Sequence, residues 1–430
     1  MHSRRTICFV LVLVLAMIAG TVYSQEPIVL EHMVWQFMFG EDIEFLEELA
    51  DEFMALNPDI EIRLEIQRNV VDALTVRTAA GIPPDVIAIS SFDALQFALK
   101  GILLDLTELM ENDPDFHEDA FIPGMLQSYT YEGESVLRYG MPYQVLTWTA
   151  SYNKSHFDEA AIPYPEEGPK WTWETARELG RKLTQRTPEG STKQYGLVID
   201  GSKRVDWAYW MALTHQAGGG IFDKIVGPSS SNFQSQAARD AIDYLMSLYD
   251  EGVAPLWVSE PGNIGISYNN VSISLHDIPS TIDNYKTTLG KSASVGHIRQ
   301  PMGPVQDGWF SDGQGFAIHS QSKNMDAAWE WVKFLTLRKE SGEKLVDDRS
   351  RINALRENLT YYAEHSDLFT IQAVLDAVSN PNNVPRFVVT DPRFWSQVVN
   401  IQMQHVATKQ TGLEAALAEI DRLSGGFLAH

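Results

Sequence analysis

Cysteine is almost absent from this sequence: its 430 residues contain one, Cys8, close to the N-terminus. A disulfide within the chain, a cysteine zinc site and a Cys-x-x-Cys redox centre are therefore excluded. His-Glu-x-x-His and Gly-x-Ser-x-Gly are missing too, which removes the common zinc and serine-nucleophile motifs. A phosphate loop ending at Gly290-Lys291-Ser292 fails because Tyr285 stands where its first glycine belongs. We therefore expect neither a metal nor a cofactor.

Positive charge is also scarce. Lys and Arg number 33 against 57 Asp and Glu, which gives a formal net charge of -24. Such an excess of negative charge repels phosphate backbones and anionic membrane surfaces, so the sequence disfavours nucleic acid and membrane-surface partners.

Only one apolar run is long, and it lies at the N-terminus. Residues 7–19 follow Arg4 and Arg5 and precede the small or compact residues 22–24, the three-part pattern of a secretory signal peptide. The run is too short for a comfortable membrane span. We predict that residues 1–24 are removed and that the mature chain is exported to the periplasm. Loss of the two arginines would change its charge from -24 to -26 (-24 minus 2).

After this leader, strand and helix patterns alternate. Residues 28–34 have a strand pattern, and residues 43–56 carry apolar side chains at helical spacing. Residues 60–66 alternate between apolar and charged, which predicts a half-exposed strand. Residues 86–89 are apolar without interruption, as in a parallel strand covered on both faces. Together these patterns predict an open α/β sheet with parallel strands.

Polar and aromatic residues follow two of these strands. Ligands of open α/β sheets bind beyond the carboxyl ends of the strands. Trp35 and Gln36 come after the first strand, whereas Ser90, Ser91 and Asp93 come after the third. We therefore predict that these five residues contact a ligand.

The remaining length indicates a second domain, because about 400 residues exceed what one core usually holds. A second lobe is predicted to begin near Trp148. Amphipathic helices are predicted over residues 235–251, opened by Ser235, and over residues 326–338. Gly313-Gln314-Gly315 lacks the third glycine of a dinucleotide site and is interpreted as a turn.

Another helix is expected at the C-terminal end of the chain. Thr411 with Glu414 three residues later has the pattern of a capping box, so we predict that the helix starts at Thr411. Gly425-Gly426 should end it.

Tryptophan is abundant, with 11 residues, several of them in predicted loops or at strand ends. Flat apolar rings beside short polar groups suit sugars, whose C–H faces stack on the rings while their hydroxyls form hydrogen bonds. Trp207, Trp210, Trp309 and Trp395 are the candidates in the second half of the chain. For each of them alone, core packing is the competing interpretation.

Carboxylates offer an enzymatic alternative, because a glycosidase needs two of them flanking the scissile bond. The candidates are Asp85, Asp93, Asp206, Asp277 and Asp312. With 57 acidic residues such a pair arises easily by chance. His276-Asp277 closes an apolar strand over residues 271–275, and we interpret it as a polar strand end at a cleft rather than a catalytic dyad.

Several short motifs, in order along the chain, resemble one known family. They are Gly81-Ile82-Pro83-Pro84-Asp85-Val86, Gly101-Ile102-Leu103-Leu104-Asp105-Leu106-Thr107, Tyr152-Asn153-Lys154, Trp171-Thr172-Trp173-Glu174, Gly218-Gly219 with Phe222, and Ser322-Lys323-Asn324 with Ala327-Ala328-Trp329. The chain resembles the extracellular solute-binding protein family 1 of ABC transporters, which contains maltose-binding and glycerol-3-phosphate-binding proteins. The similarity covers essentially the whole mature chain.

This resemblance implies an α/β, two-lobed periplasmic binding protein fold of type II topology, with a ligand cleft between the lobes and a multi-strand hinge. Lobe 1 would comprise residues 25–147 and 312–356, and lobe 2 residues 148–311 and 357–430. The chain would cross between the lobes near residues 146–150, near residues 308–313 and near Arg356.

The resemblance also implies a function: a monomeric, non-enzymatic subunit that binds a carbohydrate in the cleft and delivers it to the membrane permease of an ABC importer. It adds Tyr143 and Gln144, at the entrance to the hinge, to the expected ligand contacts. The full set is then Trp35, Gln36, Ser90, Ser91, Asp93, Tyr143, Gln144, Trp207, Trp210, His276, Asp277, Trp309 and Trp395. A secreted glycoside hydrolase and a sensor-type binding module remain alternatives. Arg393 beside Trp395 leaves an anionic ligand open, although a neutral mono- or oligosaccharide is the first choice.

Overall fold

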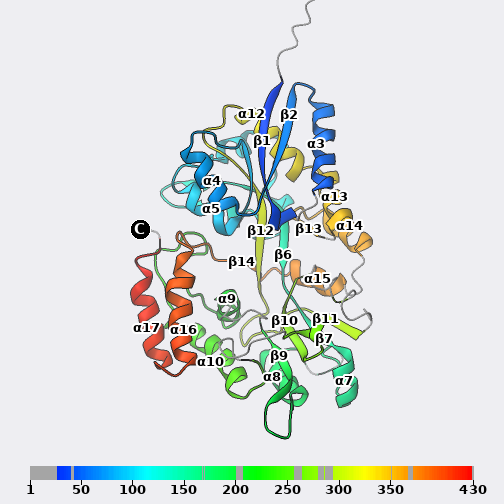
Figure 1. The fold of residues 1–430 in the computed structure, drawn as a ribbon, viewed down its shortest axis with the longest axis vertical. Coiled ribbons are helices and arrows are strands. Elements are labelled where there is room, and N and C mark those ends of the chain that lie inside the picture. Colours follow the sequence, from blue (N-terminus) through cyan, green and yellow to red (C-terminus); the bar gives the residue numbers. More distant parts are fainter. Residues whose placement is uncertain are drawn as a thin grey trace, which may run out of the picture.

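Two β-sheets lie one above the other along the long axis of the molecule, each with its own helices (Figure 1). The computed structural model describes residues 27–39, 43–166, 168, 170–199, 207–255, 264–278, 285, 294–349, 351–366 and 371–428, without the side chains of residues 37, 39, 207, 208, 276 and 349. The predicted signal peptide lies outside these residues. Within the described ranges no helix combines the length and the hydrophobicity that crossing a bilayer requires.

The first sheet contains the three N-terminal strands that the sequence predicts. Its strands, in spatial order, are β13 (Ile352–Asn353), β6 (Met141–Thr147), β12 (Phe310–Ile318), β3 (Val86–Ser90), β1 (Ile28–Trp35) and β2 (Ile60–Gln67), with β14 (Val384–Pro385) paired to the start of β12. β1 is parallel to β2 and β3, whereas β12 is antiparallel to β3 and β6. β3 is buried along its whole length, while β2 lies at the sheet edge and is only partly buried.

Helices cover both faces of this sheet. They are α2 (Gln36–Phe39), α3 (Glu44–Leu56), α4 (Val70–Ala79), α5 (Ser91–Ala98), α6 (Thr107–Asn112), α12 (Met325–Thr336), α13 (Lys339–Arg349), α14 (Asn358–His365) and α15 (Ile371–Val378), with the short turns η1 (Glu118–Ala120) and η2 (Gln127–Tyr129). Because side chains alternate along a strand, Leu30 and Val34 of β1 pack with residues of α3 and α12. Met33 packs on the other face, with residues of α4 and α5.

The second sheet is smaller and mixed. Its strands, in order, are β11 (Val295–Ile298), β7 (Thr149–Asn153), β10 (Val271–Asp277), β9 (Thr192–Val198) and β8 (Gln185–Arg186). Around it lie α7 (Lys154–Ala160), α8 (Trp173–Leu183), α9 (Trp207–Gln216), α10 (Gln236–Asp250), η3 (Ile266–Tyr268), η5 (Trp395–Val399), α16 (Asn400–Ala407) and α17 (Leu413–Ser424). A separate hairpin, β4 (Thr130–Glu132) with β5 (Val136–Arg138), belongs to neither sheet.

Three predicted helices are present, one with a different start. Ser235 caps α10 by accepting a hydrogen bond from the Ala238 amide at 3.2 Å, as expected. The helix predicted over residues 326–338 is α12, with Trp329 among its buried residues. The capping box at Thr411 is not formed: α17 begins after Gly412, and Glu414 forms an ion pair with Arg239 of α10 instead.

Gly313-Gln314-Gly315 is a strand segment rather than the predicted turn. It lies in the middle of β12, which is buried throughout, and β6 shifts register beside it. A Cβ on Gly315 would lie 2.0 Å from the Met141 carbonyl oxygen, so this glycine permits a close approach between two strands. The glycines therefore reflect sheet packing and not a loop.

The chain passes between the two sheets at three places. β6 of the first sheet is separated from β7 of the second by Trp148 alone, and Phe310, at the start of β12, packs in the hydrophobic core of the second lobe. The third passage is expected near Arg356, and this stays a prediction. Tyr362, Val374 and Val378 pack in the core of the first lobe. α15 also lies against β7 and β11 of the second sheet, and β14 pairs with the start of β12.

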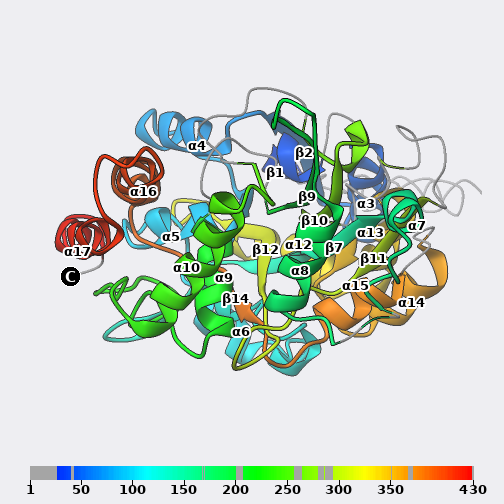
Figure 2. The same ribbon diagram turned by 90° about the horizontal axis from the view of Figure 1, so that it is seen from below.

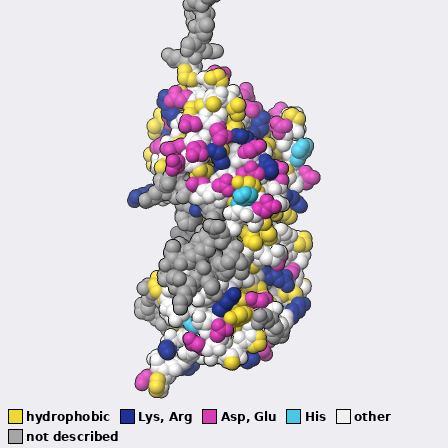
Figure 3. Space-filling view, turned by 90° about the vertical axis from the view of Figure 1, so that its right-hand side faces the viewer, with side chains coloured by type: hydrophobic (Ala, Val, Ile, Leu, Met, Phe, Trp, Pro, Cys, Tyr) yellow, Lys and Arg dark blue, Asp and Glu magenta, His cyan; other side chains and the backbone are white. Residues whose placement is uncertain are grey.

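The surface matches the acidic composition. On the face seen in Figure 3, Asp and Glu side chains dominate the upper part, over the first lobe. Some acidic groups of this lobe form ion pairs, such as Glu48 and Glu52 with Lys344.

Candidate functional site

The first-lobe candidates meet at one edge of the first sheet. Parallel pairing of Met33 with Ile87 places the end of β1, at Trp35, level with the end of β3. Trp35 and Gln36 are half-buried there, where α2 follows β1 without an intervening loop. Ser90 ends β3 and α5 starts at the next residue. The predicted juxtaposition of the two strand ends is therefore present.

Ser90 and Asp93 form a local pair at this edge. The Asp93 amide donates to Ser90 Oγ at 3.2 Å, and Ser90 Oγ donates to Asp93 Oδ2 at 3.0 Å. Burial raises the pKa of Asp93, and the negative charge of Asp312 adds to the effect, while Ser90 opposes it. Ser90 is buried, and its side chain caps the start of α5. Asp93 is half-buried, and within the described residues its Oδ1 has no hydrogen-bond partner.

Ser91 faces the hinge and not open space. Its side chain is fully buried, and its Oγ donates to Asp312 Oδ1 at 3.2 Å. Arg386, just after β14, donates from Nη1 to the other oxygen of Asp312 at 2.8 Å. The Arg386 guanidinium also lies 4.5 Å from the ring centre of Phe92 in α5. Ser91 therefore ties α5 to two strands that connect the lobes.

Gln144 belongs to a second buried network across the hinge strands. Its Nε2 donates to Gln314 Oε1 on β12, and its Oε1 accepts from Arg351 Nη1 at 3.3 Å. The same Arg351 nitrogen donates to the Met38 carbonyl oxygen in α2. The network thereby joins the segment carrying Trp35 to β6 and β12.

Tyr143, the neighbour of Gln144, lies in the hydrophobic core. Strand alternation turns it to the opposite face, where it is fully buried, packs on Phe316 at 5.2 Å and donates from Oη to the Ser341 carbonyl at 3.1 Å. Burial in this core raises the pKa of Tyr143. It is therefore not placed to meet a ligand in a cleft.

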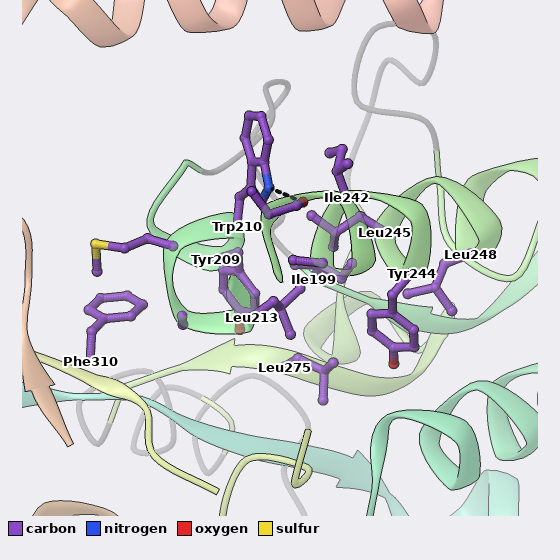
Figure 4. Close-up of a cluster of buried hydrophobic side chains, with 14 of the residues drawn as sticks. Ile199, Tyr209, Trp210, Leu213, Ile242, Tyr244, Leu245, Leu248, Leu275 and Phe310 are labelled. Carbon is purple, nitrogen blue, oxygen red and sulfur yellow. Dashed lines mark hydrogen bonds between the residues drawn. The ribbon is translucent and has the colours of Figure 1, made fainter. Parts of the chain in front are cut away.

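The tryptophans predicted in the second lobe are core residues wherever their side chains are described. Figure 4 shows Trp210 between α9 and α10, where its Nε1 donates to the Ala238 carbonyl at 2.9 Å. Trp309 packs edge-on against Tyr209 at 5.1 Å, and Trp395 packs against Phe222 at 5.7 Å. All three are less than 5% exposed. The competing interpretation, core packing, therefore accounts for these three residues.

Two further candidates, Trp207 and His276, have side chains outside the described set. Asp277, at the end of β10, is buried and accepts hydrogen bonds from Tyr285 Oη at 3.0 and 3.1 Å and from Ser274 Oγ at 3.2 Å. These contacts give it a structural role in the second lobe.

The carboxylates of the enzymatic alternative are mostly engaged in structural contacts. Asp85 accepts from Ser322 Oγ at 2.5 Å and from the Glu31 amide at 2.9 Å. Asp277 and Asp312 are held by the contacts described above, and Asp206 lies outside the described residues. Across the part of the chain that the structure describes, no cluster of three or more His, Cys, Asp or Glu could hold a metal ion.

Several residues of this region are missing from the sequence predictions: Gln314, Arg351 and Arg386, and Asp312 as the partner of Ser91. Gln314 lies in the segment interpreted as a turn, and Asp312 directly precedes it. A polar residue in a buried strand can be recognised only once the strand is known. Arg351 and Arg386 lie in irregular segments without a motif.

Comparison with known proteins decides the family. The family model described as "Bacterial extracellular solute-binding protein" matches residues 40–340, well over half of the chain. This chain belongs to that family. The solute-binding protein is 26% identical over 345 residues to a protein named maltotriose-binding protein from Pyrococcus abyssi, covering 76% of this chain and 67% of the relative.

Two further relatives extend the comparison. An sn-glycerol-3-phosphate-binding periplasmic protein from Brucella abortus is 27% identical over 199 residues, so the match spans less than half of either chain (44% of this one, 45% of the relative). Among solved structures, an ABC substrate-binding protein from Listeria monocytogenes in complex with cycloalternan superimposes with a TM-score of 0.72 at 22% identity, over 92% of this chain and 97% of the other. The two-lobed fold expected from the sequence is thereby confirmed.

Proposed function

We propose that this solute-binding protein is the carbohydrate-binding subunit of an ABC importer, which holds a sugar between its lobes and delivers it to a membrane permease. The observation that carries the proposal is the family membership together with the sequence match to a protein named for maltotriose. The bound cycloalternan in a structure of the same fold supports an oligosaccharide.

The first lobe would contribute Trp35, Gln36 and Asp93 to the sugar site. A half-buried indole offers an apolar face for a pyranose ring, and an amide and a carboxylate offer hydrogen-bonding groups to its hydroxyls. Asp93 suits this role because Ser90 fixes one of its oxygens and leaves the other available. From the second lobe, Trp207 and His276 remain the proposed contacts.

Charge favours a neutral sugar over a phosphate ester. Asp93 and Asp312 lie close enough for their negative charges to interact, and Arg386 is already paired with Asp312. Among the described residues of this edge, a phosphate would meet two carboxylates. The weaker alternative, glycerol 3-phosphate, is suggested by the shorter match to the Brucella abortus relative.

Ligand would act by stabilising the closed arrangement of the lobes. A ligand shifts such an equilibrium only through contacts that exist in one state and not in the other, so it must touch both lobes. The hinge needed for this motion would be the three passages at Trp148, Phe310 and β14.

The test is a titration of purified, ligand-stripped protein with maltotriose, maltose and glycerol 3-phosphate, followed by tryptophan fluorescence and isothermal titration calorimetry. We expect saturable binding of an oligosaccharide and a raised melting temperature, since a ligand at 100 times its Kd stabilises by about 2.7 kcal/mol. Chromatography of the sugar after prolonged incubation checks the hydrolase alternative. Release of smaller sugars, or binding of glycerol 3-phosphate alone, would refute the proposal.

A further inference from the structure

A cavity of about 680 Å³, open to solvent, lies in the first lobe and is lined by residues of η1, η2 and the β4–β5 hairpin. Its wall includes Gly124, which lies against Pro385 of β14: a Cβ on this glycine would be 3.1 Å from the proline ring. Figure 2 shows β14 and α6 on one side of β12 and the strands β1 and β2 on the other. Trp35 and Ser90 are not among the residues that line the cavity. Its volume is within the range of small-molecule sites.

Arg138 lines this cavity with incompletely used hydrogen-bonding groups. Its side chain is 18% exposed, and its ion pairs with Glu111 and Glu118 are long, at 3.5 and 3.6 Å. Both glutamates are mostly exposed, so water screens these contacts. Within the described residues the buried Nε of Arg138 has no hydrogen-bond partner. This nitrogen is not accessible from the cavity, so a ligand there would meet the Nη atoms of Arg138 and not its Nε.

Arg356 is the second basic residue in the cavity wall. Its Nε donates to the Phe121 carbonyl at 2.7 Å, while the residue as a whole is exposed. Its two Nη atoms have no hydrogen-bond partner within the described part of the chain. A guanidinium held in this way keeps donors available for a planar acceptor.

We propose that this cavity binds a small monocarboxylate with an apolar body. The carboxylate would accept hydrogen bonds from Arg138 and Arg356, because guanidinium groups match carboxylate geometry. The apolar body would lie against Phe121, Leu126 and Val136, which line the same space. Glu118, Asp119 and Glu132 also line the cavity. Their negative charge opposes a bound anion, so the carboxylate is placed at the two guanidinium groups and away from these acidic side chains. This site is independent of the proposed sugar site.

The test uses the whole purified protein and two probes of nearly equal shape, phenylacetate and its neutral amide, phenylacetamide. Calorimetry should show saturable binding of phenylacetate, and binding of the amide about 10-fold or more weaker, because hydrogen bonds to a charged group exceed neutral ones. R138M and R356M should each weaken phenylacetate binding by about 10-fold or more. R63Q, which removes an exposed arginine of β2, is the matched control and should leave it unchanged.

Equal affinity for the acid and the amide would overturn the proposal, as would unchanged phenylacetate binding in both arginine variants. Absence of saturation at about 10 mM phenylacetate would overturn it too. Repeating the titration with saturating maltotriose separates the two sites. Phenylacetate binding that persists in a protein that binds no sugar supports this site and not the sugar proposal.

Discussion

Replacing Arg386 by methionine should destabilise the protein strongly, because the change leaves a buried carboxylate without its cation. The Asp312 side chain is 5% exposed and that of Arg386 is 23% exposed, with 2.8 Å between Nη1 and Oδ2. Breaking a buried pair by removing one partner costs about 3–5 kcal/mol. Water reaches Arg386 in part, so we expect the lower end, about 3 kcal/mol. Loss of the stacking on Phe92 contributes about 0.5–1 kcal/mol of this.

The double variant D312N/R386M separates the charge effect from lost packing. The amide introduced by D312N would carry no charge and could still accept the hydrogen bond from Ser91, so the double variant should recover about 2 kcal/mol relative to R386M. Urea and thermal unfolding of ligand-free protein, each followed by fluorescence and circular dichroism, would measure the change in the free energy of unfolding. If R386M lies within about 0.5 kcal/mol of the parent protein, or if the double variant is no more stable than R386M, the reasoning fails.

Three further outcomes are expected. D93N should weaken sugar binding by about 10-fold in calorimetry with little change in melting temperature, and unchanged affinity would remove Asp93 from the site. Burial lowers the pKa of His32 from 6.5 to about 3, so the unfolded chain binds a proton that the folded chain excludes. The free energy of unfolding should then decrease as the pH falls from about 6.5 to 3. In urea titrations, H32Q should reduce the slope of the free energy of unfolding against pH by up to about 1.4 kcal/mol per pH unit. An identical slope in H32Q and the parent protein contradicts this assignment. G315A should lower the free energy of unfolding by about 3 kcal/mol or more, because the new Cβ would overlap the Met141 carbonyl. G425A is the control, since its Cβ would lie in open space, and it should unfold like the parent protein. Equal melting temperatures for the two variants would refute the packing argument.

The β-strands of the first lobe could be predicted because their patterns are local. Residues 60–66 alternate between apolar and charged because β2 is a partly exposed strand at the sheet edge. Residues 86–89 are all apolar because β3 is covered on both faces. Capping is less determined by local sequence, since Ser235 caps α10 but Thr411 does not cap α17. Glu414, the other half of the expected box, pairs with Arg239, a residue 175 positions away. A competing tertiary partner thus overrides a local motif.

The tryptophans show why site prediction from residue type is weaker than fold prediction. A tryptophan suits a core as well as it suits a sugar site, because both uses bury its ring. The Trp210 N–H donates to the Ala238 carbonyl in the neighbouring helix, a contact that no pattern around residue 210 indicates. The strand-end rule correctly brings Trp35, Ser90 and Asp93 to one edge of the sheet, since sheet topology brings strand ends together whatever their side chains. Their contact with a ligand stays a prediction.

The hinge contacts could not be predicted, because they join residues that only the folded chain brings together. Ser91 and Asp312 are 221 positions apart, and Gln144 and Gln314 are 170 apart. Each pair is buried, so removing one partner would leave the other polar side chain buried without its hydrogen bond, which costs free energy. One member of each pair, Asp312 or Gln314, lies on β12, the strand that runs from the second lobe's core at Phe310 into the first sheet. A change of angle between the lobes must therefore act on the same strand that supports Ser90 and α5. This gives a physical route by which the proposed sugar contacts and the proposed hinge would influence one another.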